Sequence, residues 1–297
     1  MLQQHTYNSK ANPRVGYLFT MIGFAILFSL VSALLFAPLI NKLVEDPSYR
    51  LFLLQIVSAS MAFLLPPILV EYYYRRKSLS YLYRYQHLPW RGRVIVPLLL
   101  LLVTSGFAAQ LLTQLMNLLP VPAFLSSLSD QSEAVTEAER LFLTESRPLG
   151  IVLSLVAIVV IAPIGEELLF RGALQGWLLA RFKNAHAVVL LGALIFSLIH
   201  LQWEGILARF FLGAILGYLA LYLGLGTSVA FHILNNLSTF MLYQAMGIEK
   251  MEAVTATLNW SDTLLGILAI VACVGVIRYL RGVAIHLERA RNNRDIE

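Results

Sequence analysis

The sequence contains few charged residues and almost no cysteine. Asp, Glu, Lys and Arg make up 13% of its 297 residues, whereas a soluble protein averages about 25%. Hydrophobic residues make up 58%, and the mean hydropathy is +0.72. This composition is unusual for a soluble domain and typical of a chain that lies largely in a membrane.

The single cysteine, Cys273, lies inside an apolar run. One cysteine excludes an internal disulfide and a thiolate metal cluster. The G-x-S-x-G motif of serine hydrolases and the H-E-x-x-H motif of zinc proteases are also absent. The sequence therefore gives no support to these two common types of hydrolytic site.

The chain has instead a series of long apolar runs. A membrane-spanning helix needs about 20 mostly apolar residues. We predict eight spans, at residues 16–41, 51–73, 94–119, 149–180, 187–202, 206–223, 227–247 and 262–281. The predicted fold class is all-α, a polytopic membrane bundle of about eight transmembrane helices. Pro66-Pro67 should kink the second helix.

Basic residues predict the orientation of the bundle. The segment between the second and third spans carries six of them and no acid: Arg75, Arg76, Lys77, Arg84, Arg91 and Arg93. The positive-inside rule places this segment in the cytoplasm. With eight spans, both termini are then cytoplasmic. The acidic loop Pro120 to Pro148 should lie outside and form a short surface helix.

The positive charge also bears on the partners of the protein. The net charge is +5 and the sequence pI is about 9.3, but the basic residues cluster at one predicted membrane face. Anionic lipid headgroups explain such a cluster, and no nucleic-acid-binding module is visible. We therefore expect a lipid bilayer as partner and no nucleic acid.

Three charged residues interrupt the apolar run Ile151 to Leu179, namely Glu166, Glu167 and Arg171. An acidic side chain at membrane depth costs about 2.5–3.5 kcal/mol on insertion scales and usually faces a bundle interior or a water-filled cavity. Residues four apart share a face of a helix. We therefore predict a structural ion pair between Glu167 and Arg171, which leaves Glu166 free for chemistry.

Two later spans carry polar residues at the same spacing. This spacing of four residues places Phe196 on the same helix face as His200, and His232 on the same face as Asn236. Glu166 and His200 lie about equally far in sequence from the predicted turn between their helices, so they should reach a similar depth. His232 should lie nearer the cytoplasmic face.

The set E-E-x-x-x-R, F-x-x-x-H and H-x-x-x-N on three spans resembles the CAAX protease and bacteriocin-processing (CPBP, or Abi) family of intramembrane peptidases, which includes type II CAAX prenyl endopeptidases. The resemblance covers about residues 150 to 245. It implies that Glu166 and His200 activate a hydrolytic water and that His232 and Asn236 form an oxyanion hole. Phe196 then supports His200.

On this resemblance we expect a membrane endopeptidase. It would hydrolyse a peptide bond of a membrane-associated protein, lipidated or leader-bearing, in a bacterial inner (plasma) membrane. Residues 1–148 would form the N-terminal transmembrane helices with their amphipathic and extracytoplasmic connections. Residues 149–247 would form the catalytic core, and residues 248–297 the last transmembrane helix and a basic cytoplasmic tail.

The residue types suit hydrolysis by an activated water. A partly desolvated carboxylate beside an imidazole can serve as a general base, and each donor to an oxyanion contributes about 3 kcal/mol. No cofactor is favoured. Zinc is the alternative, because Glu166, His200 and His232 could bind it with water in the fourth position, and family members have also been described as metalloproteases.

Two other classes of function stay open. The first is a catalytically silent membrane scaffold or bacteriocin self-immunity protein, which some relatives are thought to be. The second is a transporter, in which intramembrane Glu, Arg and His would relay protons or bind ions. Transporters often contain inverted repeats with paired broken helices, and none is visible in the sequence.

Overall fold

The computed structural model describes residues 15–75, 92–122 and 129–294. This part of the chain is helical throughout and contains no strand. Six helices are long and apolar enough to cross a membrane: Gly16–Leu43, Pro47–Tyr74, Gly92–Asn117, Pro148–Arg181, Ile206–Leu223 and Trp260–Leu287. The prediction of an all-α, multi-pass membrane bundle is confirmed.

Each of these six helices coincides with one of the eight predicted spans. The other two predicted spans are also helical, but neither meets the same criteria among the described residues. They correspond to α11 (Ala185–Leu198), which is only 14 residues long, and to α13 (Leu225–Met246), which is 22 residues long. α11 carries Phe196 of the predicted site and ends shortly before His200, and α13 carries His232 and Asn236.

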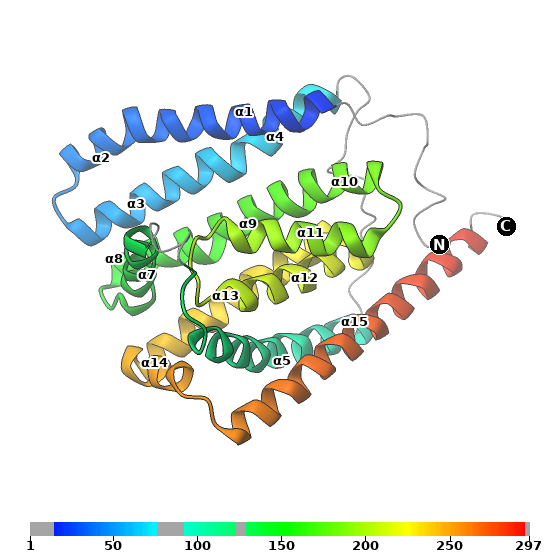
Figure 1. Cartoon of the computed structure of the whole chain (residues 1–297). Helices are drawn as coiled ribbons and strands as arrows, with labels where there is room; N and C mark the ends of the chain where they lie inside the picture. The colour runs from blue at the N-terminus through cyan, green and yellow to red at the C-terminus, as the bar shows by residue number, and fades with distance from the viewer. Residues whose placement is uncertain (1–14, 76–91, 123–128, 295–297) are drawn as a thin grey trace.

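The first two spans form one side of the bundle (Figure 1). α1 (Val15–Val31) runs through a π-helical turn into α2 (Ala37–Leu43), and α3 (Pro47–Ala59) runs through another into α4 (Leu65–Arg75). The second π-helical turn, Ser60–Leu64, directly precedes Pro66-Pro67. Proline lacks a backbone donor and π-helical turns distort helices, so the irregularity lies where the sequence predicted a kink.

The opposite side is built by α5 (Gly92–Asn117) and α15 (Trp260–Arg294), which pack along each other and against α12 (Ile206–Leu223) (Figure 1). Their interface has an apolar core, in which Leu101, Leu216 and Leu280 are completely buried. Between the two sides lies the fourth span. It consists of α8 (Pro148–Ser154), α9 (Ala162–Glu166) and α10 (Gln175–Arg181), with two π-helical segments between them.

The two ends of the bundle differ in structure. The surface helices α7 (Ser129–Thr144) and α14 (Ile248–Ala256) cap one end, and the start of α1 and the end of α15 lie at the other (Figure 1). The short surface helix predicted between Pro120 and Pro148 is confirmed as α7. Arg76, Lys77, Arg84 and Arg91 lie outside the described residues, so the assignment of the Val15 end to the cytoplasm stays a prediction.

At the capped end, three charged side chains form a cluster that joins two helices. Arg147 forms ion pairs with Asp46 and with Glu145, the latter at 2.7 Å. Asp46 also caps α3 by accepting hydrogen bonds from the backbone N–H groups of Ser48 and Tyr49, at 2.9 and 3.0 Å. The Arg147 guanidinium lowers the pKa of both carboxyl groups below their usual range. This outer cluster (Asp46, Glu145, Arg147) ties the start of α3 to the start of α8.

Candidate active site

Glu166 and Glu167 lie at a break in the fourth span. Glu166 ends α9, and Glu167 begins the π-helical segment Glu167–Leu174. A second π-helical segment, Leu155–Ile161, precedes α9. Such turns are rare and occur frequently at functional sites, because the extra residue changes the direction in which side chains point.

Glu167 is completely buried and fully paired. One carboxylate oxygen accepts hydrogen bonds from Arg171 at 2.8 Å and from Nδ1 of His232 at 2.9 Å. The other oxygen accepts a hydrogen bond from the Ser228 hydroxyl at 2.6 Å. A buried charge is costly unless it is paired and hydrogen-bonded, and this carboxylate satisfies both conditions.

Arg171 is held from the opposite side by α12 and α11. Its second terminal nitrogen donates to the carbonyl oxygen of Gly213 at 3.1 Å, and its guanidinium carbon lies 4.3 Å from the centre of the Phe196 ring. A side chain at position 213 would come within 3.1 Å of the backbone of Ala193. Glycine at this position therefore allows α12 to pack closely against α11.

Glu166 has a different environment. Its side chain is 15% exposed, whereas that of Glu167 is 0% exposed, and its carboxylate oxygen lies 3.9 Å from Nε2 of His232. Arg171 pairs with Glu167 rather than with Glu166. Of the two adjacent carboxylates, only Glu166 is therefore both partly exposed and without an ion pair to an arginine in the part of the chain that the structure describes.

The hydrogen bonds of His232 fix its orientation. An ionised carboxylate can only accept hydrogen bonds, so Nδ1 must carry the proton that it shares with Glu167. Nε2 then faces Glu166. In the neutral ring Nε2 accepts a hydrogen bond, and in the imidazolium ion it donates one.

His200 is oriented by the backbone. Its Nδ1 lies 2.8 Å from the carbonyl oxygen of Phe196, which can only accept, so Nδ1 carries the proton and Nε2 is left as an acceptor. α11 ends just before it, and the next residue, Leu201, has a φ of 54°. This left-handed conformation is costly for a branched side chain, and it stops the helix at the histidine.

Phe196 lies beside both histidines. Its ring centre is 5.0 Å from that of His200 and 6.1 Å from that of His232. The residue is buried, as expected for a side chain that supports its neighbours. The two histidines therefore border one region, with Phe196 between them.

The depth of His232 differs from the sequence expectation. We expected Glu166 and His200 at one level and His232 nearer the cytoplasmic face, but His232 is the histidine in direct contact with Glu166. Among the described residues there is no hydrogen bond between Glu166 and His200. The depth estimate assumed regular helices, and the π-helical segments of the fourth span invalidate that assumption.

Asn236 lies one turn beyond His232 on α13 and is half-buried. Its side-chain nitrogen donates to the carbonyl oxygen of Ile158 at 2.8 Å, in the first π-helical segment. Its side-chain oxygen accepts from Asn235 at 3.3 Å. An amide nitrogen has two N–H groups, so one of them stays available.

Sequence reasoning did not identify Ser228, which holds Glu167 and also donates to the carbonyl oxygen of Leu216. The signal was present, because Ser228, His232 and Asn236 follow one another at intervals of four residues and so share one face of α13.

The zinc alternative can be compared with the geometry. No group of three or more His, Cys, Asp or Glu side chains suited to a metal occurs within the described ranges. Glu166, His200 and His232 therefore do not form a three-ligand site as they stand, and no step through a metal is derived from them.

The fold and this site together define a class of protein. It is a polytopic α-helical membrane protein with a buried glutamate, histidine and asparagine site, built from its fourth span and the helices that follow it. Residues 148–238 match the family model described as Type II CAAX prenyl endopeptidase Rce1-like. These residues are thus similar to this family of membrane proteases, in agreement with the resemblance seen in the sequence.

The matched segment covers about a third of the chain and contains Glu166, His200, His232 and Asn236. A comparison with curated proteins and one with solved structures gave no match. Over this third of the chain, the similarity is therefore to a family of membrane endopeptidases.

Proposed function

We propose that this protein is an intramembrane peptidase that hydrolyses a peptide bond of a membrane-associated protein by means of an activated water. The observation that carries the proposal is the unequal pairing of two adjacent carboxylates. Glu167 is buried and holds His232, while the half-buried Glu166 faces the other nitrogen of the same ring at 3.9 Å. The protease family of the domain supports the same class of reaction.

In this proposal Glu166 is the general base. It takes a proton from water as the water oxygen bonds to the carbonyl carbon of the substrate, and the carbonyl oxygen becomes an oxyanion. The carbon–nitrogen bond then breaks, and the leaving nitrogen takes the proton from Glu166. The products are a carboxylic acid and an amine, and no covalent intermediate with the enzyme forms.

The hydrogen bonds of the two histidines support different roles. His200 donates a hydrogen bond from Nδ1 to a backbone carbonyl oxygen, which leaves Nε2 as an acceptor for the second hydrogen of the water. His232 donates a hydrogen bond from Nδ1 to the Glu167 carboxylate, and this negative charge can stabilise the ring as an imidazolium ion with a second proton on Nε2. His232 can then donate from Nε2 to the oxyanion, together with the remaining N–H of Asn236.

The substrate class follows from the setting and from the name of the family. A site inside a membrane bundle suits a substrate that carries a lipid or a membrane anchor. The matched family is described by its action on CAAX prenyl proteins, so a prenylated C-terminal peptide is the first substrate to test. A leader-bearing membrane precursor is the second.

The test uses purified protein in proteoliposomes and a library of membrane peptides, each with and without a farnesyl group, with products identified by mass spectrometry. Wild type and Glu166→Gln are compared with and without a strong chelator. The proposal predicts products from wild type in both conditions and none from the variant.

Equal products from both proteins would contradict the proposal. An absence of products from wild type with every peptide would favour the scaffold or transporter classes. Loss of wild-type activity with the chelator alone would favour the zinc alternative.

A further inference from the structure

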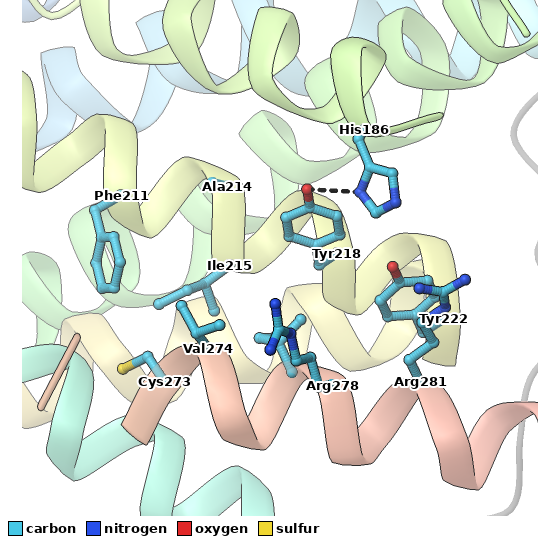
Figure 2. A pocket seen from close by; sticks show the side chains of 11 residues that line it. His186, Phe211, Ala214, Ile215, Tyr218, Tyr222, Cys273, Val274, Arg278 and Arg281 are labelled. Carbon is cyan, nitrogen blue, oxygen red and sulfur yellow. Dashed lines mark hydrogen bonds between the residues drawn. The ribbon is translucent and has the colours of Figure 1, made fainter. Parts of the chain in front are cut away.

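A cavity lies between α12 and α15, away from the proposed active site. Its volume is about 420 Å³, which is within the range of about 300–1,000 Å³ that small-molecule sites occupy. Figure 2 shows α12 on one side, α15 on the other and His186 of α11 at the rim. None of the residues proposed for catalysis lines it.

α12 separates this cavity from the active site. Gly213 and Gly217 face the fourth span, where their carbonyl oxygens accept hydrogen bonds from Arg171 and Gln175. Ala214 and Tyr218, the residues directly after those glycines, line the cavity. Neighbouring residues of a helix point about 100° apart, so the two sites use different faces of α12.

The cavity has an apolar part and a cationic part. Phe211, Ile215 and Val274 belong to the apolar part, and the guanidinium groups of Arg278 and Arg281 lie near the other end (Figure 2). Both arginines are exposed and lie three residues apart, on one face of α15. This arrangement matches a molecule with an apolar chain and an anionic head.

No acid balances these two arginines. No Asp or Glu lines the cavity, and among the described residues neither Arg278 nor Arg281 forms a salt bridge. The tyrosines beside them provide hydroxyl groups rather than charge. Tyr218 shares a hydrogen bond of 2.9 Å with Nδ1 of His186, and its ring stacks on that of Tyr222 at 5.8 Å.

The cationic part lies toward the end of the bundle where α15 finishes and α1 begins (Figures 1 and 2). This is the end predicted to face the cytoplasm, where anionic lipids lie in the membrane. Basic pockets between transmembrane helices on that side bind anionic headgroups. The apolar part then extends toward the hydrocarbon region.

We propose that this cavity binds one anionic phospholipid of the surrounding bilayer. The phosphate contacts the guanidinium groups of Arg278 and Arg281, and part of one acyl chain packs against Phe211, Ile215 and Val274. The lipid joins α12 to α15 and so braces the helix whose Gly213 carbonyl holds Arg171. This binding is independent of the proposed peptidase activity.

The test measures binding of dioleoyl phosphatidylglycerol to delipidated, detergent-solubilised full-length protein by native mass spectrometry. Dioleoyl phosphatidylcholine and sodium phosphate are tested in parallel. Each arginine near a lipid phosphate changes the affinity by about fivefold, so the double variant Arg278→Gln, Arg281→Gln should bind phosphatidylglycerol about thirtyfold more weakly. The control Lys183→Gln, Arg289→Gln removes the same charge outside the cavity and should bind like wild type.

A second variant, Ala214→Leu, keeps both arginines and narrows the apolar part of the cavity. It should also lose phosphatidylglycerol binding, with an unchanged unfolding temperature in lipid-free detergent as evidence that it folds. The proposal is overturned if both lipids bind equally, if the arginine variant and its control lose the same affinity, or if Ala214→Leu binds like wild type. Displacement of the lipid by sodium phosphate, or by a farnesylated peptide, would also overturn it.

Discussion

The outer cluster and the candidate active site each contain two carboxylates and one arginine, and the two places pair their charges differently. In the outer cluster, Arg147 binds both Asp46 and Glu145. In the membrane, Arg171 binds Glu167, and Glu166 is left facing His232. The same set of charges therefore makes a clamp in one place and exposes a carboxylate in the other.

In the candidate active site, one carboxylate can hold the neighbouring side chains in place while the other is left for chemistry. A fully paired charge can only hold its partners, as Asp46 and Glu145 do. Glu167 does the same and, in addition, orients the His232 ring toward its neighbour in sequence. Glu166 faces a histidine and forms no ion pair with any described arginine, which is the feature that the outer cluster lacks.

The largest expected effect is on catalysis. Glu166→Gln removes the proposed base and should lower the rate of peptide cleavage by about 10²–10⁴-fold. Glu145→Gln makes the same chemical change in the outer cluster and should leave the rate per folded molecule unchanged. The measurement is cleavage of the best peptide from the library by both variants. An equal loss of rate in both would contradict a catalytic role that is specific to Glu166.

The next effect is on stability. Glu167→Gln leaves Arg171 as an uncompensated buried charge, and breaking such a pair costs about 3–5 kcal/mol of unfolding free energy. Arg147→Gln disrupts the outer cluster, in which the arginine side chain is 42% exposed, and should have a smaller effect. Unfolding of each variant in detergent by a denaturant provides the comparison. Equal losses of unfolding free energy in the two variants would mean that the burial of Arg171 does not make its ion pair more important for stability than the outer cluster.

A third prediction concerns the oxyanion. Asn236→Ala removes one proposed donor and should lower kcat by about 10²–10³-fold with little change in KM. Its neighbour Asn235 provides the matched control, because Asn235→Ala removes the same group one position away and should retain most of the activity. Similar kinetics for the two variants would assign no special role to Asn236.

The smallest effect is the response of the outer cluster to acid. Arg147 lowers the pKa values of Asp46 and Glu145 below their ordinary values of 3.8 and 4.5. Carboxyl groups with lowered pKa values stabilise the folded protein above their ordinary pKa and lose that contribution as the pH falls through the lowered pKa. The unfolding temperature should therefore decline below about pH 4.

The same measurement on Arg147→Gln isolates the cluster. Without the guanidinium the pKa values return toward their ordinary values, so the decline below about pH 4 should become shallower. A variant with the same acid response as wild type would show that other carboxyl groups cause the decline.

Most of the fold could be predicted from the sequence, because a membrane restricts the chain to helices of sufficient length. Hydropathy alone located six spans that the structure contains. It could not locate the π-helical segments beside Glu166 and Glu167. These depend on how the fourth span packs against α12 and α13.

Of the contacts at the candidate site, the sequence predicted one and missed another. Spacing at four residues joined Glu167 to Arg171, a pair that the structure contains. It did not bring His232 to both glutamates, because that contact depends on the relative depth of two helices. The outer cluster was also missed, since Asp46 and Arg147 lie 101 residues apart in sequence.

The most direct test of the account measures activity and stability on the same preparations of Glu166→Gln and Glu167→Gln. Peptide cleavage by a known amount of folded protein gives the rate, and denaturant unfolding gives the free energy. We predict that Glu166→Gln loses cleavage and keeps wild-type stability, while Glu167→Gln loses about 3–5 kcal/mol of unfolding free energy. Cleavage by Glu166→Gln at the wild-type rate, or equal destabilisation of both variants, would contradict the division of roles between the two glutamates.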